Sequence, residues 1–189
     1  MSSDGGRAAM LSNSQPRYAI ATVTAVGKDL ALTLREKLGK EIPIYTTPRL
    51  ADDRVIAIEG RVIEALGQLF QEVDVLICIM AIGAVVRAIA PVLKDKATDP
   101  AVVVMDEKAT NVISLLSGHL GGANQVTLDI AELLGSNPVI TTATDVQNVT
   151  ALDNLAQSVN GWRPELREFI KPFNSYLGSG RTVYFYQEK

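Results

Sequence analysis

The chain has only one cysteine and one histidine in 189 residues, and this scarcity limits its chemistry. A single cysteine, Cys78, cannot form an internal disulfide, and its place in the apolar run 75–79 predicts a small core residue, not a nucleophile. One histidine and one cysteine cannot build a usual zinc site. A chain without an internal disulfide fits a reducing compartment, so we expect a cytoplasmic protein.

Long apolar runs, a basic surface and the common phosphate motifs are also missing. The longest apolar candidate, 75–93, is interrupted by Gly83, Arg87 and Pro91, so no membrane span is predicted. A net charge of −3 and a pI near 5.2 argue against general nucleic-acid binding. There is no Gly-Lys-Ser/Thr phosphate motif, and no dinucleotide fingerprint follows the first predicted strand. Residues 1–15 are rich in Ser, Gly and Ala without an apolar centre, so we expect a disordered leader and no signal peptide.

Apolar residues make up 47% of the chain, which is enough for a sizeable core. Short apolar runs predict strands at 17–24, 42–45, 74–80, 101–105, 111–116 and 138–142. Helical spacing predicts helices over 30–38, 62–70, 84–90 and 123–134, with Gly39 and Gly135 ending two of them. Pro43 suits an edge strand. The alternation predicts an α/β fold over 16–145: a mainly parallel open sheet with helices on both faces, a Rossmann-like three-layer domain. Residues 146–189 read as the start of a second unit.

A glycine-rich connection, residues 117–122, lies between the strand 111–116 and the helix that follows; we call it the glycine joint. It contains Ser117, Gly118, His119, Gly121 and Gly122, with Asn124 just beyond. A helix that starts here leaves backbone N–H groups that favour an anion, whereas the alternative is a tight turn needing unusual glycine angles. Histidine is the side chain best suited to acid–base work near neutral pH, so His119 is a candidate general base or acid, or else a structural histidine bonded to a carbonyl. Ser117 and Asn124 are hydrogen-bond donors for a ligand, or cap and turn residues.

Ligands of open α/β sheets lie beyond the carboxyl ends of the strands. Four marked segments follow predicted strands: 80–87, 106–107, 117–124 and 141–145. If all strands are parallel, these segments gather along one edge. Gly83 lets a ligand approach the backbone, and Arg87 is suited to bidentate pairing with a carboxylate. Arg87 is equally well explained as a solvated side chain or the partner of Asp74 or Asp106.

Three further candidates come from the same segments and the loop near them. Lys96 belongs to a small basic cluster around Asp95, or to a plain exposed loop. Thr142 lies in the segment that follows the last predicted strand. Asp145 is placed to orient His119 or a water molecule, or simply to cap the helix near Ala151.

Four stretches in the same order resemble the amino-terminal part of the CbiG family: 80–91, 95–102, 115–124 and 139–145. The resemblance covers about 18–145, and more loosely the chain to 186. It implies a cobalt-precorrin-5A hydrolase of the anaerobic cobalamin route, which opens a δ-lactone on a cobalt-containing macrocycle and releases acetaldehyde. Family members usually carry a further carboxy-terminal domain, and a glycine turn that the family tends to have is missing around 108–111.

The resemblance also implies roles for the candidates. His119 would activate water, with Asp145 as its partner, and the N–H groups of Gly121 and Gly122 would hold the oxyanion. Arg87 and Lys96 would bind substrate carboxylates. Gly83, Ser117, Gly118, Asn124 and Thr142 complete the expected binding set. The cobalt travels with the substrate, so no protein cofactor is expected.

Two other functions stay open at this point. One is a non-catalytic macrocycle-binding module, or a subunit that needs a separate carboxy-terminal domain or another pathway enzyme as partner. The other is a nucleotide-binding α/β domain, against which the missing phosphate motif counts. Neither a nucleic acid nor a membrane is expected as a partner.

Overall fold

A computed structural model describes residues 15–95, 98–119, 121–142, 172–173, 175–176 and 181. Within them lies a seven-stranded sheet in the order β3-β2-β1-β4-β5-β6-β7. Its strands are β1 (Tyr18–Thr22), β2 (Ile44–Thr46), β3 (Ile56–Ala57), β4 (Val75–Ile79), β5 (Ala101–Met105), β6 (Asn111–Leu116) and β7 (Asn137–Val139). Its α-helices are α1 (Ala25–Leu38), α2 (Val62–Glu72), α3 (Ile82–Ile89) and α4 (Ala123–Leu134), with 3₁₀ turns at Pro48–Leu50 and Ala90–Val92.

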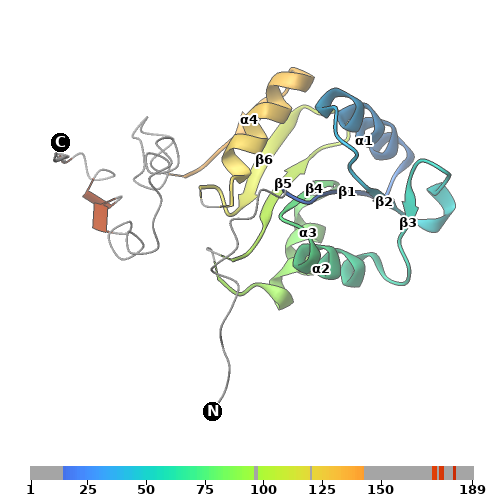
Figure 1. Cartoon of the computed structure of the whole chain (residues 1–189), viewed down its shortest axis with the longest axis horizontal. Coiled ribbons are helices and arrows are strands. Elements are labelled where there is room, and N and C mark those ends of the chain that lie inside the picture. Colours follow the sequence, from blue (N-terminus) through green and yellow to red (C-terminus); the bar gives the residue numbers. More distant parts are fainter. Residues whose placement is uncertain are drawn as a thin grey trace, which may run out of the picture.

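The sheet is the middle of three layers, as the sequence predicts. Helices α1 and α4 cover one face, and α2 and α3 cover the other (Figure 1). Side chains of β4 and β5 are buried along their whole length, which is typical of strands covered on both faces. Successive strand residues supply the two cores in turn: Ile20 and Ile77 face α1 and α4, whereas Ala21 and Leu76 face α2 and α3.

Strand direction divides the sheet into two parts. Strands β1 to β5 are mutually parallel, but β6 is antiparallel to β5, and β7 is parallel to β6. Only residues 106–110 separate β5 from β6, and a parallel crossover needs a dozen or more residues. The connection is therefore a hairpin. A mainly parallel sheet is confirmed, but its last two strands run the other way.

The two helix ends predicted at glycines are confirmed, the first helix starts earlier than expected, at Ala25, and two expectations about strands are wrong. Gly39 and Gly135 end α1 and α4 in the left-handed conformation. The strand 42–45 is not an edge strand, because the short, exposed β3 pairs outside β2. Pro43 lies before β2, so its lack of a backbone N–H group removes no hydrogen bond from that strand. Its carbonyl accepts a hydrogen bond from Ile20 N–H on β1. The last strand starts at Asn137 and ends at Val139, earlier than 138–142.

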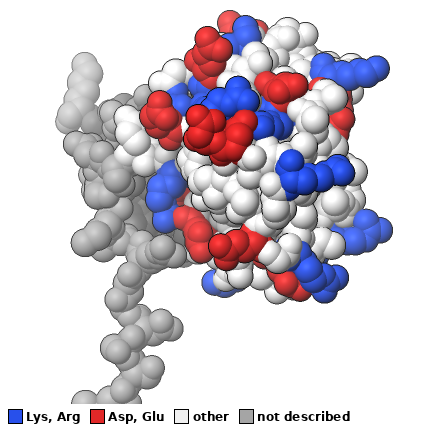
Figure 2. Space-filling model, turned by 90° about the vertical axis from the view of Figure 1, so that its right-hand side faces the viewer, with Lys and Arg blue, Asp and Glu red and all other residues white. Residues whose placement is uncertain are grey.

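Surface charge agrees with the acidic, mixed composition. On the face that Figure 2 shows, Lys and Arg side chains are interspersed with Asp and Glu, without a broad basic area. No helix among the described residues has the length and apolar character needed to cross a membrane. The expected leader, apart from Gln15, and nearly all of the expected second unit lie outside the described residues.

Candidate functional site

The direction of β6 divides the four candidate segments between two edges of the sheet. We call the edge where β1, β4 and β5 end the carboxyl edge, and the edge where they begin the amino edge. Segments 80–87 and 106–107 lie at the carboxyl edge, because they follow β4 and β5. Segments 117–124 and 141–142 lie at the amino edge, because they follow β6 and β7. The expected gathering of all four along one edge is therefore wrong.

Most of the expected site residues lie at the amino edge. They are Ser117, Gly118, His119, Gly121, Gly122, Asn124 and Thr142. Gly83 and Arg87 lie on α3 at the opposite side, and β5 between the edges spans about 13 Å at ~3.3 Å per residue. Lys96 and Asp145 lie outside the described residues.

The glycine joint satisfies its own helix start. Ala123 N–H donates to the Ser117 carbonyl at 3.2 Å, and Asn124 N–H donates to the Gly118 carbonyl at 3.0 Å. Gly122 N–H donates to the His119 carbonyl at 3.0 Å, so it is not available as an oxyanion donor in this conformation. These bonds support the tight-turn alternative for the first N–H groups of α4.

Close packing explains two of the joint's glycines. A Cβ atom on Gly118 would lie 2.6 Å from Asn124 Oδ1, and one on Gly121 would lie 2.5 Å from Ser117 Cβ. Such separations are far below ordinary contact, so neither position accepts a side chain without movement of the joint. Ser117 itself has a φ of +58°, a left-handed conformation that costs a non-glycine residue energy.

Asn124 ties three elements together. Its Oδ1 accepts from Ser114 Oγ on β6 at 2.6 Å, and its Nδ2 donates to Thr142 Oγ1 after β7 at 3.3 Å. The side chain is buried, with 7% of the residue exposed. Because both ends of the amide bind other protein groups, Asn124 holds the joint in place and the expected ligand contact is not supported.

Ser117 anchors the joint to the start of β5. Its hydroxyl donates to the Asp99 carbonyl at 2.9 Å. His119 is half-buried within the same turn, which lies at the amino edge beside the entry to β5.

Arg87 contacts Gly83, as their spacing predicts. Its Nη1 donates to the Gly83 carbonyl at 3.0 Å, and the side chain is otherwise exposed. Asp74 pairs instead with Arg17, through Nη2–Oδ1 at 3.1 Å and Nε–Oδ2 at 3.2 Å. The solvated reading of Arg87 therefore holds among the described residues, and the ion pair with Asp74 is wrong.

Asp106 serves the hairpin turn. Its Oδ2 accepts from Asn111 N–H at 2.7 Å, and its Oδ1 accepts from Lys108 N–H and Thr110 N–H at 3.0 and 3.1 Å. Desolvation alone would raise the Asp106 pKa, but these backbone hydrogen bonds outweigh it and hold the pKa below its ordinary value. The carboxylate is therefore ionised at neutral pH and occupied within the turn.

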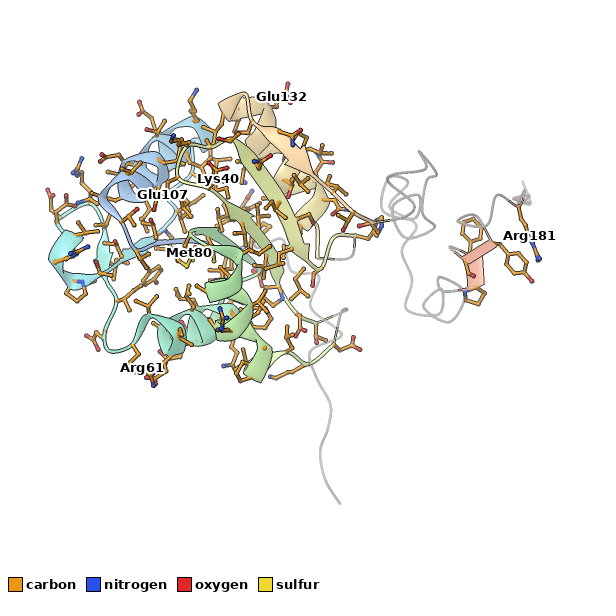
Figure 3. The ribbon with its side chains drawn as sticks, turned by 180° about the vertical axis from the view of Figure 1, so that it is seen from behind. Lys40, Arg61, Met80, Glu107, Glu132 and Arg181 are labelled. Atoms are coloured by element: carbon orange, nitrogen blue, oxygen red, sulfur yellow. The ribbon has the colours of Figure 1, made fainter. Side chains whose placement is uncertain are left out.

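A contact between Thr24 and Glu107 was not predicted from the sequence. Thr24 Oγ1 donates to Glu107 Oε1 at 2.6 Å and accepts from Gly27 N–H at 3.1 Å, so it caps α1 (Glu107 is labelled in Figure 3). The first turn of α1 contains no acidic residue, and Glu107 supplies the missing negative charge from the hairpin. A threonine before a helical run is a recognisable N-cap signal, but no sequence pattern indicates that Glu107, 83 residues further along the chain, binds Thr24.

Cys78 and the described carboxylates give no sign of a nucleophile or a metal centre. Burial raises the pKa of the Cys78 thiol to about 12, which confirms the predicted core role. Among the described residues, no three His, Cys, Asp or Glu side chains come together as metal ligands.

Residues 64–145 match the family described as Cobalamin synthesis G N-terminal. A cobalt-precorrin-5A hydrolase of Salmonella typhimurium is 43% identical over 154 residues, which is 80% of this chain and 44% of that protein. A cobalt-precorrin-5A hydrolase of Priestia megaterium is 39% identical over 176 residues, which is 90% of this chain and 46% of that protein. The chain thus spans less than half the length of these curated relatives.

A solved structure supports the fold. The crystal structure of a putative cobalamin biosynthesis protein G homolog from Sulfolobus solfataricus superposes with a TM-score of 0.54 at 23% identity. The match covers 92% of this chain and 51% of that one. At this identity the likeness confirms the α/β architecture.

Proposed function

We propose that this chain supplies the amino-terminal part of a cobalt-precorrin-5A hydrolase, because residues 64–145 match the family described as Cobalamin synthesis G N-terminal. One observation carries the proposal: the matched range contains the entire glycine joint and the residues that hold it, Asp99, Asn124 and Thr142. Two relatives named for this activity are 39% and 43% identical over most of the chain. The substrate is then a cobalt-containing macrocycle, and the protein needs no cofactor of its own.

We assign the chemistry to the amino edge. Opening of a δ-lactone adds water across the carbonyl–oxygen bond, and a base must remove the water proton as the new bond forms. His119 is our candidate for this base, because it is half-buried at the edge where the joint meets β5. The proton passes to the lactone oxygen, which leaves the carbonyl carbon as a hydroxyl. When that hydroxyl loses its proton and the carbon–carbon bond to the macrocycle breaks, the two-carbon fragment leaves as acetaldehyde, and the imidazole can deliver a proton to the ring carbon. Asp145 remains the proposed partner of His119.

The hydrogen bonds within the joint reduce the set of residues that we propose for substrate binding. Gly121 N–H remains the proposed oxyanion donor, since Gly122 N–H is bonded to His119. Ser117, Gly118 and Thr142 shape the site, and Lys96 is proposed as a carboxylate contact in the loop before β5. Substrate contacts with Gly83 and Arg87 are not part of the proposal, because these two residues lie across the sheet.

An anaerobic turnover assay tests this function. The purified chain is incubated with cobalt-precorrin-5A, and acetaldehyde is trapped and quantified. We expect His119→Ala to lower turnover by about 10²–10⁴-fold, the usual contribution of a general base. Lys108→Ala is the matched control, because Lys108 is exposed at the other end of β6. If His119→Ala and the unaltered chain release acetaldehyde at the same measurable rate, His119 is not the general base.

The alternative function, a macrocycle-binding module, has its own result in this assay. A bound macrocycle with a shifted absorption spectrum but no acetaldehyde would mean that chemistry needs a separate carboxy-terminal part. If the chain neither binds the macrocycle nor releases acetaldehyde, the proposal is contradicted.

A further inference from the structure

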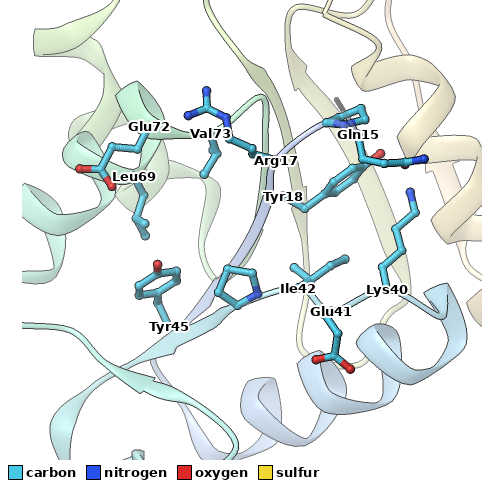
Figure 4. Close-up of a pocket in the computed structure, with 12 residues that line it drawn as sticks. Gln15, Arg17, Tyr18, Lys40, Glu41, Ile42, Tyr45, Leu69, Glu72 and Val73 are labelled. Carbon is cyan, nitrogen blue, oxygen red and sulfur yellow. The ribbon is translucent and has the colours of Figure 1, made fainter. Parts of the chain in front are cut away.

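A cavity of about 610 Å³ opens at the amino edge, beside the start of β1 and β2 (Figure 4). Its apolar lining includes Tyr18, which packs on the α1 face of the sheet, and Tyr45, Leu69 and Val73, which pack on the α2 face, so the cavity extends around the end of β1. Ligand sites of proteins range over roughly 300–1,000 Å³ and are mostly apolar with a few polar groups. The size and lining of this cavity therefore suit a flat organic ligand.

Lys40 brings positive charge to this lining. Its Nζ lies 4.4 Å from the centroid of the Tyr18 ring, and it forms no ion pair with any described residue. Arg17, on the same rim, is neutralised by Asp74. Glu41 and Glu72 also line the cavity, but in Figure 4 both carboxylates point away from Tyr18. An anionic group of a ligand would thus be attracted to the Lys40 side of the opening.

The cavity and the glycine joint lie on the same edge of the sheet. Asp74 N–H donates to the Arg17 carbonyl at 2.9 Å, and Ala101 N–H donates to the Asp74 carbonyl at 3.0 Å. These bonds connect the starts of β1, β4 and β5, and Ser117 binds just before β5. From β1 to β5 is two strand spacings, about 10 Å. One large planar ligand can therefore reach both places without crossing the sheet.

Building on the proposed function, we propose that this cavity binds one side of the cobalt-precorrin macrocycle while the lactone lies at the glycine joint. The ring system lies across the end of β1, beside Tyr18 on one face of the sheet and Tyr45 on the other, and the Lys40 ammonium pairs with a peripheral carboxylate. The amino edge then binds the substrate along its length, from β2 to β6.

Binding of cobyrinic acid, a cobalt corrin with free carboxylates, tests the proposal by calorimetry on the full chain. Val73→Phe fills the cavity and should weaken binding by at least about tenfold, as expected for losing one buried apolar contact. Lys40→Met should weaken binding by about threefold at low salt and lose that difference at high salt. Lys37→Met, an exposed change on the last turn of α1 outside the cavity, is the control and should bind normally.

Circular dichroism would establish that Val73→Phe is folded. Unchanged affinity in both Val73→Phe and Lys40→Met would overturn the cavity assignment, even if the chain turns over cobalt-precorrin-5A. Cavity-dependent binding without turnover would instead support the cavity and mean that the chemistry needs a separate carboxy-terminal part, so the two failures are distinguishable.

Discussion

Gly118→Ala tests whether the glycine joint is held by close packing. The new Cβ would lie 2.6 Å from Asn124 Oδ1, 3.0 Å from its Cγ and 3.1 Å from its Nδ2. Asn124 is 7% exposed, so its amide cannot move aside into solvent. Any movement breaks its bonds to Ser114 at 2.6 Å and to Thr142 at 3.3 Å.

The expected loss follows from these contacts. Overpacking a tight site costs about 1–3 kcal/mol, and each disrupted buried hydrogen bond costs about 1 kcal/mol. With two such bonds, a total of roughly 3–5 kcal/mol lowers the melting temperature of a chain of this length by roughly 6–20 °C. Gly122→Ala is the matched control: its φ is +83° with no atom within 4 Å of a new Cβ, so only backbone strain of about 1 kcal/mol applies.

Thermal melts followed by circular dichroism, with urea titrations, measure both variants. Gly118→Ala should melt well below Gly122→Ala. Equal melting of Gly118→Ala and the unaltered chain, or a larger loss in Gly122→Ala, would mean that the joint is not packed against Asn124.

Three further outcomes are expected. Cys78 should not react with a thiol reagent at pH 8 until the chain unfolds, because burial holds its pKa near about 12; rapid labelling of the folded chain would contradict this. Hydrogen bonds from Arg54 and then Lys28 hold the Asp52 pKa below its usual value, so the stabilisation is present above about pH 4 and is lost as acid protonates the carboxylate. Asp52→Asn should therefore flatten the decline in urea midpoint between about pH 5 and 2, and an unchanged slope would refute it. Gly83→Ala should be neutral or up to ~1 kcal/mol more stable, since a helix favours Ala and the nearest atom is the movable end of an exposed Arg side chain; a clear loss of stability would show a tighter contact.

The buried strands were predictable because their signal is local. Runs such as 75–79 and 101–105 are continuously apolar, and this pattern at this length is typical of a strand covered on both faces. The ends of α1 and α4 were predictable for a similar reason, because Gly39 and Gly135 take left-handed angles that other residues resist.

The site was harder to predict, because it depends on strand direction. An apolar strand has the same pattern in either direction, so the sequence alone does not show that 111–116 runs antiparallel to β5 and that the joint after it lies at the amino edge. The five-residue connection 106–110 carried the missing signal, since it is too short for a crossover. The bonds of Thr24 with Glu107 and of Arg17 with Asp74 join residues far apart in sequence, and no local pattern encodes them.

The most direct measurement is an amide NMR titration of the ¹⁵N-labelled chain with diamagnetic cobalt(III) cobyrinic acid. If the amino edge is the substrate site, the signals of Tyr18 and Gly118 should shift together with one affinity, while those of Gly83 and Glu107 stay in place. Shifts confined to Gly83 and Glu107 would put the ligand at the carboxyl edge and contradict the assignment.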